Sequence, residues 1–326
     1  MIINIAYLTS LREIGFDESV GREVVDPDSG ERYGYRESVV EAITREAQRM
    51  PFPFPQFCNL TAIVVDDNEE DFCELMKKSP VWPNLRIPVV NQERFMHPRE
   101  DSDDFYTEAN LDDLLVCIPS EPWRRIKDKA RKRQAKAEFE KTIAEVLVER
   151  KVDIVVSDSY RNIIGPVLLA AYGRRILNIH PAITKAGDPA RLPGATPTRD
   201  AYTRAVFGYI IIDDKKGVDL PQGEVVQVRY EGKARTAVKV PKSNMHGITV
   251  HVVNAKLDDG PVVYEECYEF NPKGITVERI RQINYTIKRR IVPAAVLAYL
   301  YDNSSVLSLI REAKNRMYER ELALER

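Results

Sequence analysis

Short runs of β-branched and aliphatic residues alternate with longer amphipathic stretches along most of this chain. The runs at Ile2 to Leu8, Leu60 to Asp67 and Val152 to Ser157 have the length and composition of strands. Residues 124–150 have the pattern of a long helix. Strands that alternate with helices are joined by crossover connections, which place helices over a parallel sheet. The alternation therefore predicts an α/β fold with a mostly parallel sheet flanked by helices.

Further segments complete the predicted order of elements. Glu37 to Gln48 and Val167 to Tyr172 have helical patterns, and Leu111 to Pro119 is apolar enough for another strand. At about 207–245, apolar runs alternate around turn residues. This pattern predicts a β-rich insertion, built as a hairpin or a small sheet.

Composition limits the classes of function. The 326 residues suit one large domain, which we place at 1–302, followed by a C-terminal helical extension at 303–326. Lys and Arg number 48 against 50 Asp and Glu, so net charge gives no reason to expect a nucleic acid partner. The four Cys and four His are not spaced as metal ligands. The sequence has no signal peptide pattern and no apolar run of about 18 residues, so we expect a cytoplasmic protein without a membrane partner.

Polar residues end one of the apolar runs, in the segment "ILNIHPAI" at 176–183. Asn178 and His180 alternate along it, so their side chains point to the same face of a strand. In α/β proteins, ligands bind at the carboxyl edge of the sheet, where this strand ends. The pair is therefore a candidate site, although either residue alone is usually only a hydrogen-bonding group at a strand end.

A second block, "HGITVHVVNAKLDDGPV", follows downstream. The order Asn-x-His-Pro, His-Gly-x-(Thr/Ser)-Val-His and Asp-x-Gly-Pro resembles the formyltransferase family that uses N10-formyltetrahydrofolate. The resemblance covers residues from about 150 to 300. It implies a Rossmann-like formyltransferase fold, with N10-formyltetrahydrofolate as the formyl donor.

The chemistry explains why these residue types belong together. Formyl transfer between nitrogens passes through a tetrahedral oxyanion, which the Asn178 amide and a protonated His180 can stabilise by hydrogen bonds. A neighbouring carboxylate is needed to favour the charged imidazole near neutral pH. The resemblance assigns that role, and a proton relay, to Asp258, whereas Asp259 fills the variable position of the motif. We predict Asn178, His180 and Asp258 as catalytic residues.

The resemblance also implies where the folate binds. Backbone groups and apolar side chains of two segments would hold the pterin, and His251 would border the site, although a structural role for His251 is an equal alternative. Two of the residues, Arg161 and Asn162, can instead face solvent. The predicted cofactor-binding residues are Tyr160, Arg161, Asn162, Ile163, Ile164, His251, Asn254, Ala255, Lys256 and Leu257.

The acceptor is less constrained. The segment "AYLTSLREIGF" after the first predicted strand has no glycine before Gly15, so a phosphate-binding loop is not evident. With the insertion, this resembles siderophore-pathway transformylases that formylate N5-hydroxyornithine. Arg191, Arg199 and Asp200 are candidates to bind an amino acid acceptor, or only to anchor their loop. The alternatives are a nucleotide-linked amino-sugar N-formyltransferase, a glycinamide ribonucleotide transformylase, a hydrolase with water as acceptor, and a non-catalytic folate-binding protein. The oligomeric state stays open.

Overall fold

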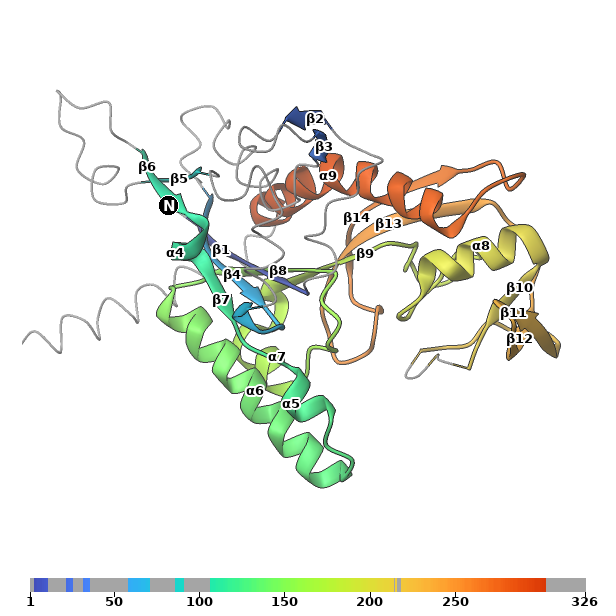
Figure 1. The fold of residues 1–326 in the computed structure, drawn as a ribbon, viewed down its shortest axis with the longest axis horizontal. Coiled ribbons are helices and arrows are strands. Elements are labelled where there is room, and N and C mark those ends of the chain that lie inside the picture. Colours follow the sequence, from blue (N-terminus) through green and yellow to red (C-terminus); the bar gives the residue numbers. More distant parts are fainter. Residues whose placement is uncertain are drawn as a thin grey trace, which may run out of the picture.

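The computed structural model describes residues 3–10, 22–25, 32–35, 58–70, 86–90, 106–213, 215 and 218–302. Within these residues a seven-stranded sheet has the order β14-β13-β9-β8-β1-β4-β7 (Figure 1). All neighbours from β9 to β7 are parallel, and β13 is antiparallel to both β9 and β14. The predicted mostly parallel sheet is confirmed. Its strands are β1 (Ile3–Thr9), β4 (Cys58–Val65), β7 (Leu115–Cys117), β8 (Ile154–Asp158), β9 (Ile176–His180), β13 (Met245–Val252) and β14 (Val262–Glu269).

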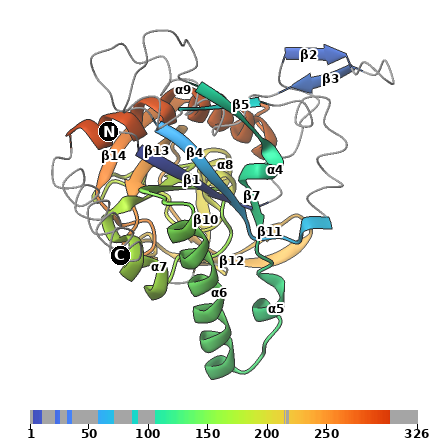
Figure 2. The same ribbon diagram turned by 90° about the vertical axis from the view of Figure 1, so that its left-hand side faces the viewer.

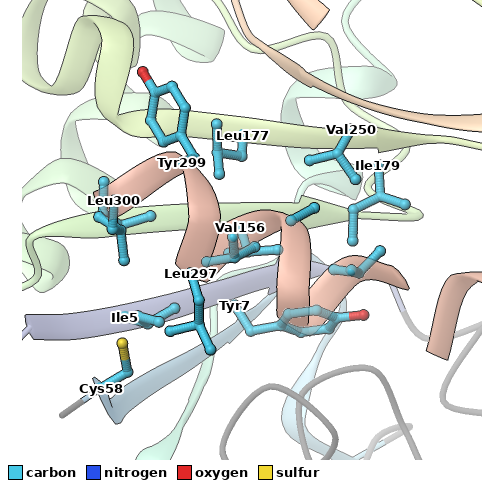
Figure 3. Close-up of a cluster of buried hydrophobic side chains, with 14 of the residues drawn as sticks. Ile5, Tyr7, Cys58, Val156, Leu177, Ile179, Val250, Leu297, Tyr299 and Leu300 are labelled. Atoms are coloured by element: carbon cyan, nitrogen blue, oxygen red, sulfur yellow. The ribbon is translucent and has the colours of Figure 1, made fainter. Parts of the chain in front are cut away.

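Helices cover both faces of this sheet (Figure 2). Helix α9 (Val277–Asp302) lies on one face, whereas α6 (Lys129–Glu149) and α7 (Pro166–Tyr172) lie on the other. Leu297, Tyr299 and Leu300 of α9 pack over the central strands (Figure 3). Side chains alternate between the faces, so Leu177 and Ile179 of β9 join the α9 core. Asn178 and His180 consequently belong to the α6/α7 face.

The segment predicted as a β-rich insertion forms a separate three-stranded antiparallel sheet in the order β10-β12-β11. Its strands are β10 (Tyr209–Ile211), β11 (Val225–Tyr230) and β12 (Lys233–Lys239). It follows α8 (Pro197–Phe207) and lies beside that helix, at the end of the molecule remote from β7 (Figure 1). The prediction of a small sheet at this place is confirmed.

Short elements account for most differences from the sequence prediction. The segment Leu111 to Pro119 is not one strand, because Leu111–Leu114 forms helix α4 before β7 begins. The helix predicted at 124–150 begins only at Lys129, where the Asp128 side chain accepts the Arg131 N–H at 2.8 Å and caps α6. A separate turn of helix, α5 (Glu121–Arg124), precedes it.

Four further strands and a 3-10 turn complete the described elements: β2 (Arg22–Val25) pairs with β3 (Arg32–Tyr35), β5 (Arg86–Val90) pairs with β6 (Tyr106–Asn110), and η3 is Gly173–Arg175. The helix predicted at Glu37 to Gln48 and the extension at 303–326 lie outside the described residues. No helix in the described part of the chain combines the length and apolar character needed to cross a membrane. In the same residues, no cluster of three or more His, Cys, Asp or Glu side chains could hold a metal ion.

Candidate active site

Two adjacent strands bring three polar side chains to one face of the sheet. In the antiparallel register of β9 and β13, Asn178 lies opposite His251 and His180 lies opposite Thr249. Directly opposed residues of neighbouring strands point to the same face, with their Cβ atoms about 5 Å apart. The period of two within each strand then places Asn178, His180 and His251 together.

Asp258 joins them from the turn that leads from β13 back to β14. The Val252 N–H donates to the Pro261 carbonyl at 2.9 Å and closes this turn. At Gly260 a Cβ atom would stand 1.7 Å from the Val252 carbonyl oxygen, so only glycine fits there. Asp258 itself has φ 51, a left-handed conformation that Asp adopts more readily than most residues. Close packing thus accounts for Gly260 in the Asp-Asp-Gly-Pro turn, and the left-handed backbone suits Asp258.

The structure brings Asn178, His180, Asp258 and His251 into contact. His180 Nδ1 is 3.5 Å from Asp258 Oδ1, and His251 Nε2 is 3.6 Å from the same oxygen. The other carboxylate oxygen accepts the backbone N–H of Gly194 at 2.8 Å. His180, His251 and Asp258 are all buried. The carboxylate therefore lies between two imidazoles and accepts a hydrogen bond from a loop amide.

His251 has a closer relation to Asn178 than its sequence position suggests. Its Nδ1 lies 3.1 Å from the Val252 carbonyl oxygen, which only an N–H can approach favourably. Nε2 is then unprotonated and accepts from Asn178 Nδ2 at 3.1 Å. This hydrogen bond turns the amide nitrogen of Asn178 toward His251 and leaves its second N–H for another acceptor. The family resemblance alone places His251 only at the border of the folate pocket.

Burial shifts the pKa values of both Asp258 and His180. Burial raises the pKa of Asp258, but the charge of His180, the neighbouring His251 and the Gly194 amide together outweigh it, so the pKa of this carboxyl lies well below its usual range. Burial also lowers the pKa of His180, and the opposing attraction of Asp258 does not compensate. The shift is opposite to the direction expected from the sequence, because desolvation of the imidazolium outweighs its neighbour. His180 Nε2 lies 3.0 Å from the Leu192 carbonyl oxygen.

The first segment predicted to bind the folate, 160–164, contains both buried and exposed residues. Asn162 is buried rather than solvent-facing, and its amide donates to Asp66 Oδ2 at 2.6 Å and accepts from Arg124 Nε at 2.9 Å. Arg161 is exposed, although its backbone N–H donates to Ser10 Oγ at 3.0 Å. Tyr160 and Ile164 pack against the α6/α7 core, whereas Ile163 is 59% exposed. The cluster around Asp66 has no signal in the sequence.

The second segment, 254–257, is a surface turn. The Asn254 side chain accepts the backbone N–H of Lys256 at 2.9 Å, which is an Asx turn. Lys256 Nζ lies 3.1 Å from Asp219 and 3.4 Å from Asp259. Asn254, Ala255 and Lys256 are exposed, and Leu257 is half-buried. Exposed backbone of this kind is compatible with recognition of a pterin ring.

The residues considered for acceptor binding contact groups of their own loop and of neighbouring turns. Arg191 donates to the Thr184 carbonyl and to Asp259 Oδ1, each at 2.9 Å. Asp200 is fully buried, with Arg199 Nη2 at 3.2 Å and Lys215 Nζ at 2.7 Å. These contacts favour the loop-anchoring alternative for Arg191, Arg199 and Asp200. Sequence reasoning does not find Lys215, because no local pattern marks a lysine whose partners lie in a different loop.

Comparisons with known proteins show which proteins this chain resembles. The model of the formyl transferase family matches residues 115–219. Phosphoribosylglycinamide formyltransferase of Bacillus subtilis (strain 168) is 27% identical over 161 residues, which cover 49% of this chain and 60% of the relative. Formyltetrahydrofolate deformylase of the same organism is 26% identical over 167 residues, covering 51% of this chain and 41% of the relative. The chain thus spans less than two thirds of the length of these curated relatives.

A solved structure extends the similarity to most of the chain. PvdF of pyoverdin biosynthesis, described as a structurally unique N10-formyltetrahydrofolate-dependent formyltransferase, superposes with a TM-score of 0.59 and 23% identity. The match covers 91% of this chain and 99% of PvdF. The chain therefore resembles the N10-formyltetrahydrofolate-dependent formyltransferases, with their fold and with a formyl transferase domain over residues 115–219.

Proposed function

We propose that this protein transfers a formyl group from N10-formyltetrahydrofolate to the nitrogen of a small acceptor. One observation carries the proposal: Asp258 lies 3.5 Å from His180, at the strand face that also carries Asn178. An amide donor, an imidazole and an ionised carboxylate are the groups that this transfer needs. The folds of the relatives support the choice of donor.

Asn178, His180 and Asp258 have separate roles in the transfer. The free N–H of Asn178 donates to the oxyanion that forms when the acceptor nitrogen attacks the formyl carbon. His180, whose lowered pKa keeps it neutral near pH 7, donates its Nε2–H to the Leu192 carbonyl, so its Nδ1 accepts the proton that the acceptor nitrogen loses. Asp258 stabilises the resulting imidazolium. His180 then returns the proton to the folate nitrogen as its bond to the formyl carbon breaks, which yields tetrahydrofolate and the formylated acceptor.

We further propose N5-hydroxyornithine as the acceptor. The structural relative PvdF acts in pyoverdin biosynthesis, and the present sequence has no glycine before Gly15 in the segment after its first strand. A hydroxylamine nitrogen is neutral at pH 7 and is itself nucleophilic. A weak base is therefore sufficient to remove its proton, and a histidine with a lowered pKa is such a base. Glycinamide ribonucleotide is the second candidate, because a phosphoribosylglycinamide formyltransferase is 27% identical over half of the chain.

The test measures tetrahydrofolate release from N10-formyltetrahydrofolate with each acceptor at equal concentration. The panel contains N5-hydroxyornithine, ornithine, glycinamide ribonucleotide, a nucleotide-linked amino sugar and no acceptor, and Asn178→Ala serves as the inactive control. We expect release with N5-hydroxyornithine and a formylated product of matching mass. Product with the ribonucleotide alone contradicts the choice of acceptor. Release of formate without any acceptor contradicts the transferase assignment and indicates hydrolysis.

A further inference from the structure

The connection between β10 and β11 returns from the three-stranded sheet to the candidate site. Lys215, in this connection, has a side chain that is only 3% exposed. Its Nζ lies 2.7 Å from Asp200 Oδ2 and donates to the Pro193 carbonyl at 2.9 Å. A buried ammonium is retained only with such partners, because desolvation without them costs several kcal/mol. Lys215 therefore links the insertion firmly to the loop that follows His180.

The contact with Pro193 lies next to the catalytic carboxylate. Gly194 follows Pro193 in the chain and donates its N–H to Asp258 Oδ2 at 2.8 Å. Gly194 has φ +101, and a Cβ atom at this residue would meet Lys215 Nζ at 3.6 Å and Val218 at 3.7 Å. The same connection thus packs against Gly194 and binds the carbonyl before it. Lys215 and Asp258 therefore hold the two ends of one peptide group, the Pro193 carbonyl and the Gly194 N–H.

The connection is itself anchored to the small sheet. The Ile212 N–H donates to the Thr236 carbonyl at 2.9 Å, and the Thr236 N–H donates to the Asp213 carboxylate at 3.0 Å. The backbone N–H of Lys215 then donates to the Ile212 carbonyl at 3.1 Å and closes a turn. Thr236 belongs to β12, the central strand of this sheet. The position of Lys215 is therefore set by the sheet rather than by the loop that it binds.

A second contact from the same connection is weak by comparison. Asp219 lies 3.1 Å from Lys256 and 3.9 Å from Arg191, but its side chain is 67% exposed. Exposed ion pairs contribute little, because water and salt screen them. Among the described contacts of the connection, the buried pair of Lys215 is the one able to hold the loop in place.

We propose that Lys215 is a positioning residue, through which the three-stranded sheet holds Pro193 and Gly194 so that Asp258 faces His180. The proposal rests on the function proposed above for Asp258 and His180. It gives the insertion a role in the geometry of the active site. Lys215 touches neither reactant, and its effect on turnover passes through the loop.

Removing Lys215 also alters the electrostatics of His180. The charged and titratable groups that act on this imidazole are Asp258, His251, Lys215 and His246, together with the Leu192 carbonyl. Lys215 lowers the pKa of His180, as a like charge does. The loss of this charge alone would move the titration of His180 to higher pH. Displacement of Asp258 removes a larger attraction, so the proposal predicts a net shift of this titration to lower pH.

The experiment compares Lys215→Met with the double variant Asp200→Asn/Lys215→Met, and uses Lys239→Met as the control. Lys239 belongs to the same sheet, and its ion pair with Glu224 is exposed. Lys215→Met leaves Asp200 buried with Arg199 as its remaining ionic partner among the described contacts, so thermal stability should fall. The double variant removes both charges and should recover much of that stability. Both Lys215 variants lose the donor that Lys215 supplies to the Pro193 carbonyl.

We expect kcat to fall up to about 100-fold in both Lys215 variants, the size of effect that a misplaced catalytic group produces. The KM values of the Lys215 variants should change little. The activity of Lys239→Met should stay close to that of the wild type. If the double variant regains activity along with stability, Lys215 serves only to neutralise Asp200 and the proposal is wrong. The His180 ring protons, titrated by NMR, should shift to lower pH in Lys215→Met but not in Lys239→Met. A shift to higher pH in Lys215→Met would show that Asp258 stays beside His180 and would contradict the proposal. This readout holds even if the wild-type protein transfers no formyl group, so a wrong function and a wrong role for Lys215 are distinguishable.

Discussion

Asn178 can stabilise an oxyanion only if its amide nitrogen, rather than its oxygen, faces the reacting carbonyl. His251 selects that orientation by accepting one N–H at 3.1 Å. We expect His251→Leu to lower kcat about 10- to 100-fold, less than the loss of a whole oxyanion donor. His251→Gln, whose side-chain oxygen can accept the same N–H, should retain most of the activity. Steady-state kinetics measures both, and an equal loss in the two variants contradicts the orienting role.

The two consecutive aspartates differ sharply in their surroundings. Asp258 is buried against His180, whereas Asp259 is partly exposed and pairs with Arg191 at 2.9 Å. Asp258→Asn keeps the shape and removes the charge that stabilises the imidazolium, so kcat should fall about 100-fold or more. Asp259→Asn should cost no more than a few-fold. Both variants need the same assay, and the opposite ranking would show that Asp259 is the catalytic carboxylate.

Local sequence patterns are sufficient to predict part of this site. The period of two along β9 is sufficient to place Asn178 and His180 on one face, and the motif order points to Asp258. The lowered pKa of His180 cannot be read from its sequence neighbours, because burial arises from the whole fold. Lys215 and Asp66 act through partners far away in the chain, and no spacing rule identifies such contacts.

The turn between β13 and β14 shows how an element determines the place of a catalytic group. A Cβ atom on Gly260 would overlap the Val252 carbonyl, so Gly260→Ala must displace the turn that carries Asp258. We expect a loss of about 3 kcal/mol in the free energy of unfolding, at the upper end of overpacking effects, together with most of the activity. Urea unfolding measures the first quantity.

Gly274 supplies the matched control for that substitution. It has φ +75, and a Cβ atom added there would have no heavy atom of the described residues within 4 Å. Gly274→Ala should therefore cost only the left-handed strain of about 1 kcal/mol. Its activity should stay near that of the wild type. If Gly260→Ala is as mild as Gly274→Ala, the turn is able to relax and does not fix Asp258.

The elements themselves are predictable to different degrees. Buried strands such as β8 are continuous apolar runs, and their predicted places are correct within two residues. The segment Leu111 to Pro119 is misassigned because its apolar composition does not distinguish a strand from a short helix. There the Asp113 carboxylate accepts the Asn110 N–H at 2.9 Å and favours a helical turn. Capping contacts of this kind decide boundaries that hydrophobic patterns leave open.

Strand β13 contributes side chains to both faces of the sheet. Thr249 and His251 point toward the candidate site, whereas Ile248 and Val250 pack beneath α9. His246, on the α9 side, lies 3.2 Å from Asn284 of that helix. The active-site strand is thus fixed from behind by the long C-terminal helix, and a disturbance of that helix contact should reach the catalytic face.

His246 should govern how the stability of the whole molecule depends on pH. Asn284 Oδ1 accepts the Tyr268 hydroxyl at 2.5 Å, so Asn284 Nδ2 is the group that donates to His246 Nε2. That nitrogen is therefore unprotonated. Burial, with Arg204 and His180 nearby, lowers the pKa of His246 from 6.5 to about 3. The unfolded chain then binds a proton below pH 6.5 that the folded protein does not bind until near pH 3, so stability is lost as pH falls through this window.

We expect the wild type to lose about 1.4 kcal/mol of unfolding free energy per pH unit for this proton between about pH 6.5 and pH 5. His180, with its lowered pKa, adds a loss of the same sign, whereas Asp258 titrates in a more acidic range. His246→Gln, whose oxygen can accept from Asn284, should remove only the first contribution. Urea unfolding of both proteins at about pH 7 and pH 5 measures the difference. Identical pH dependence would show that His246 is protonated in the folded protein and that the Asn284 amide is turned the other way.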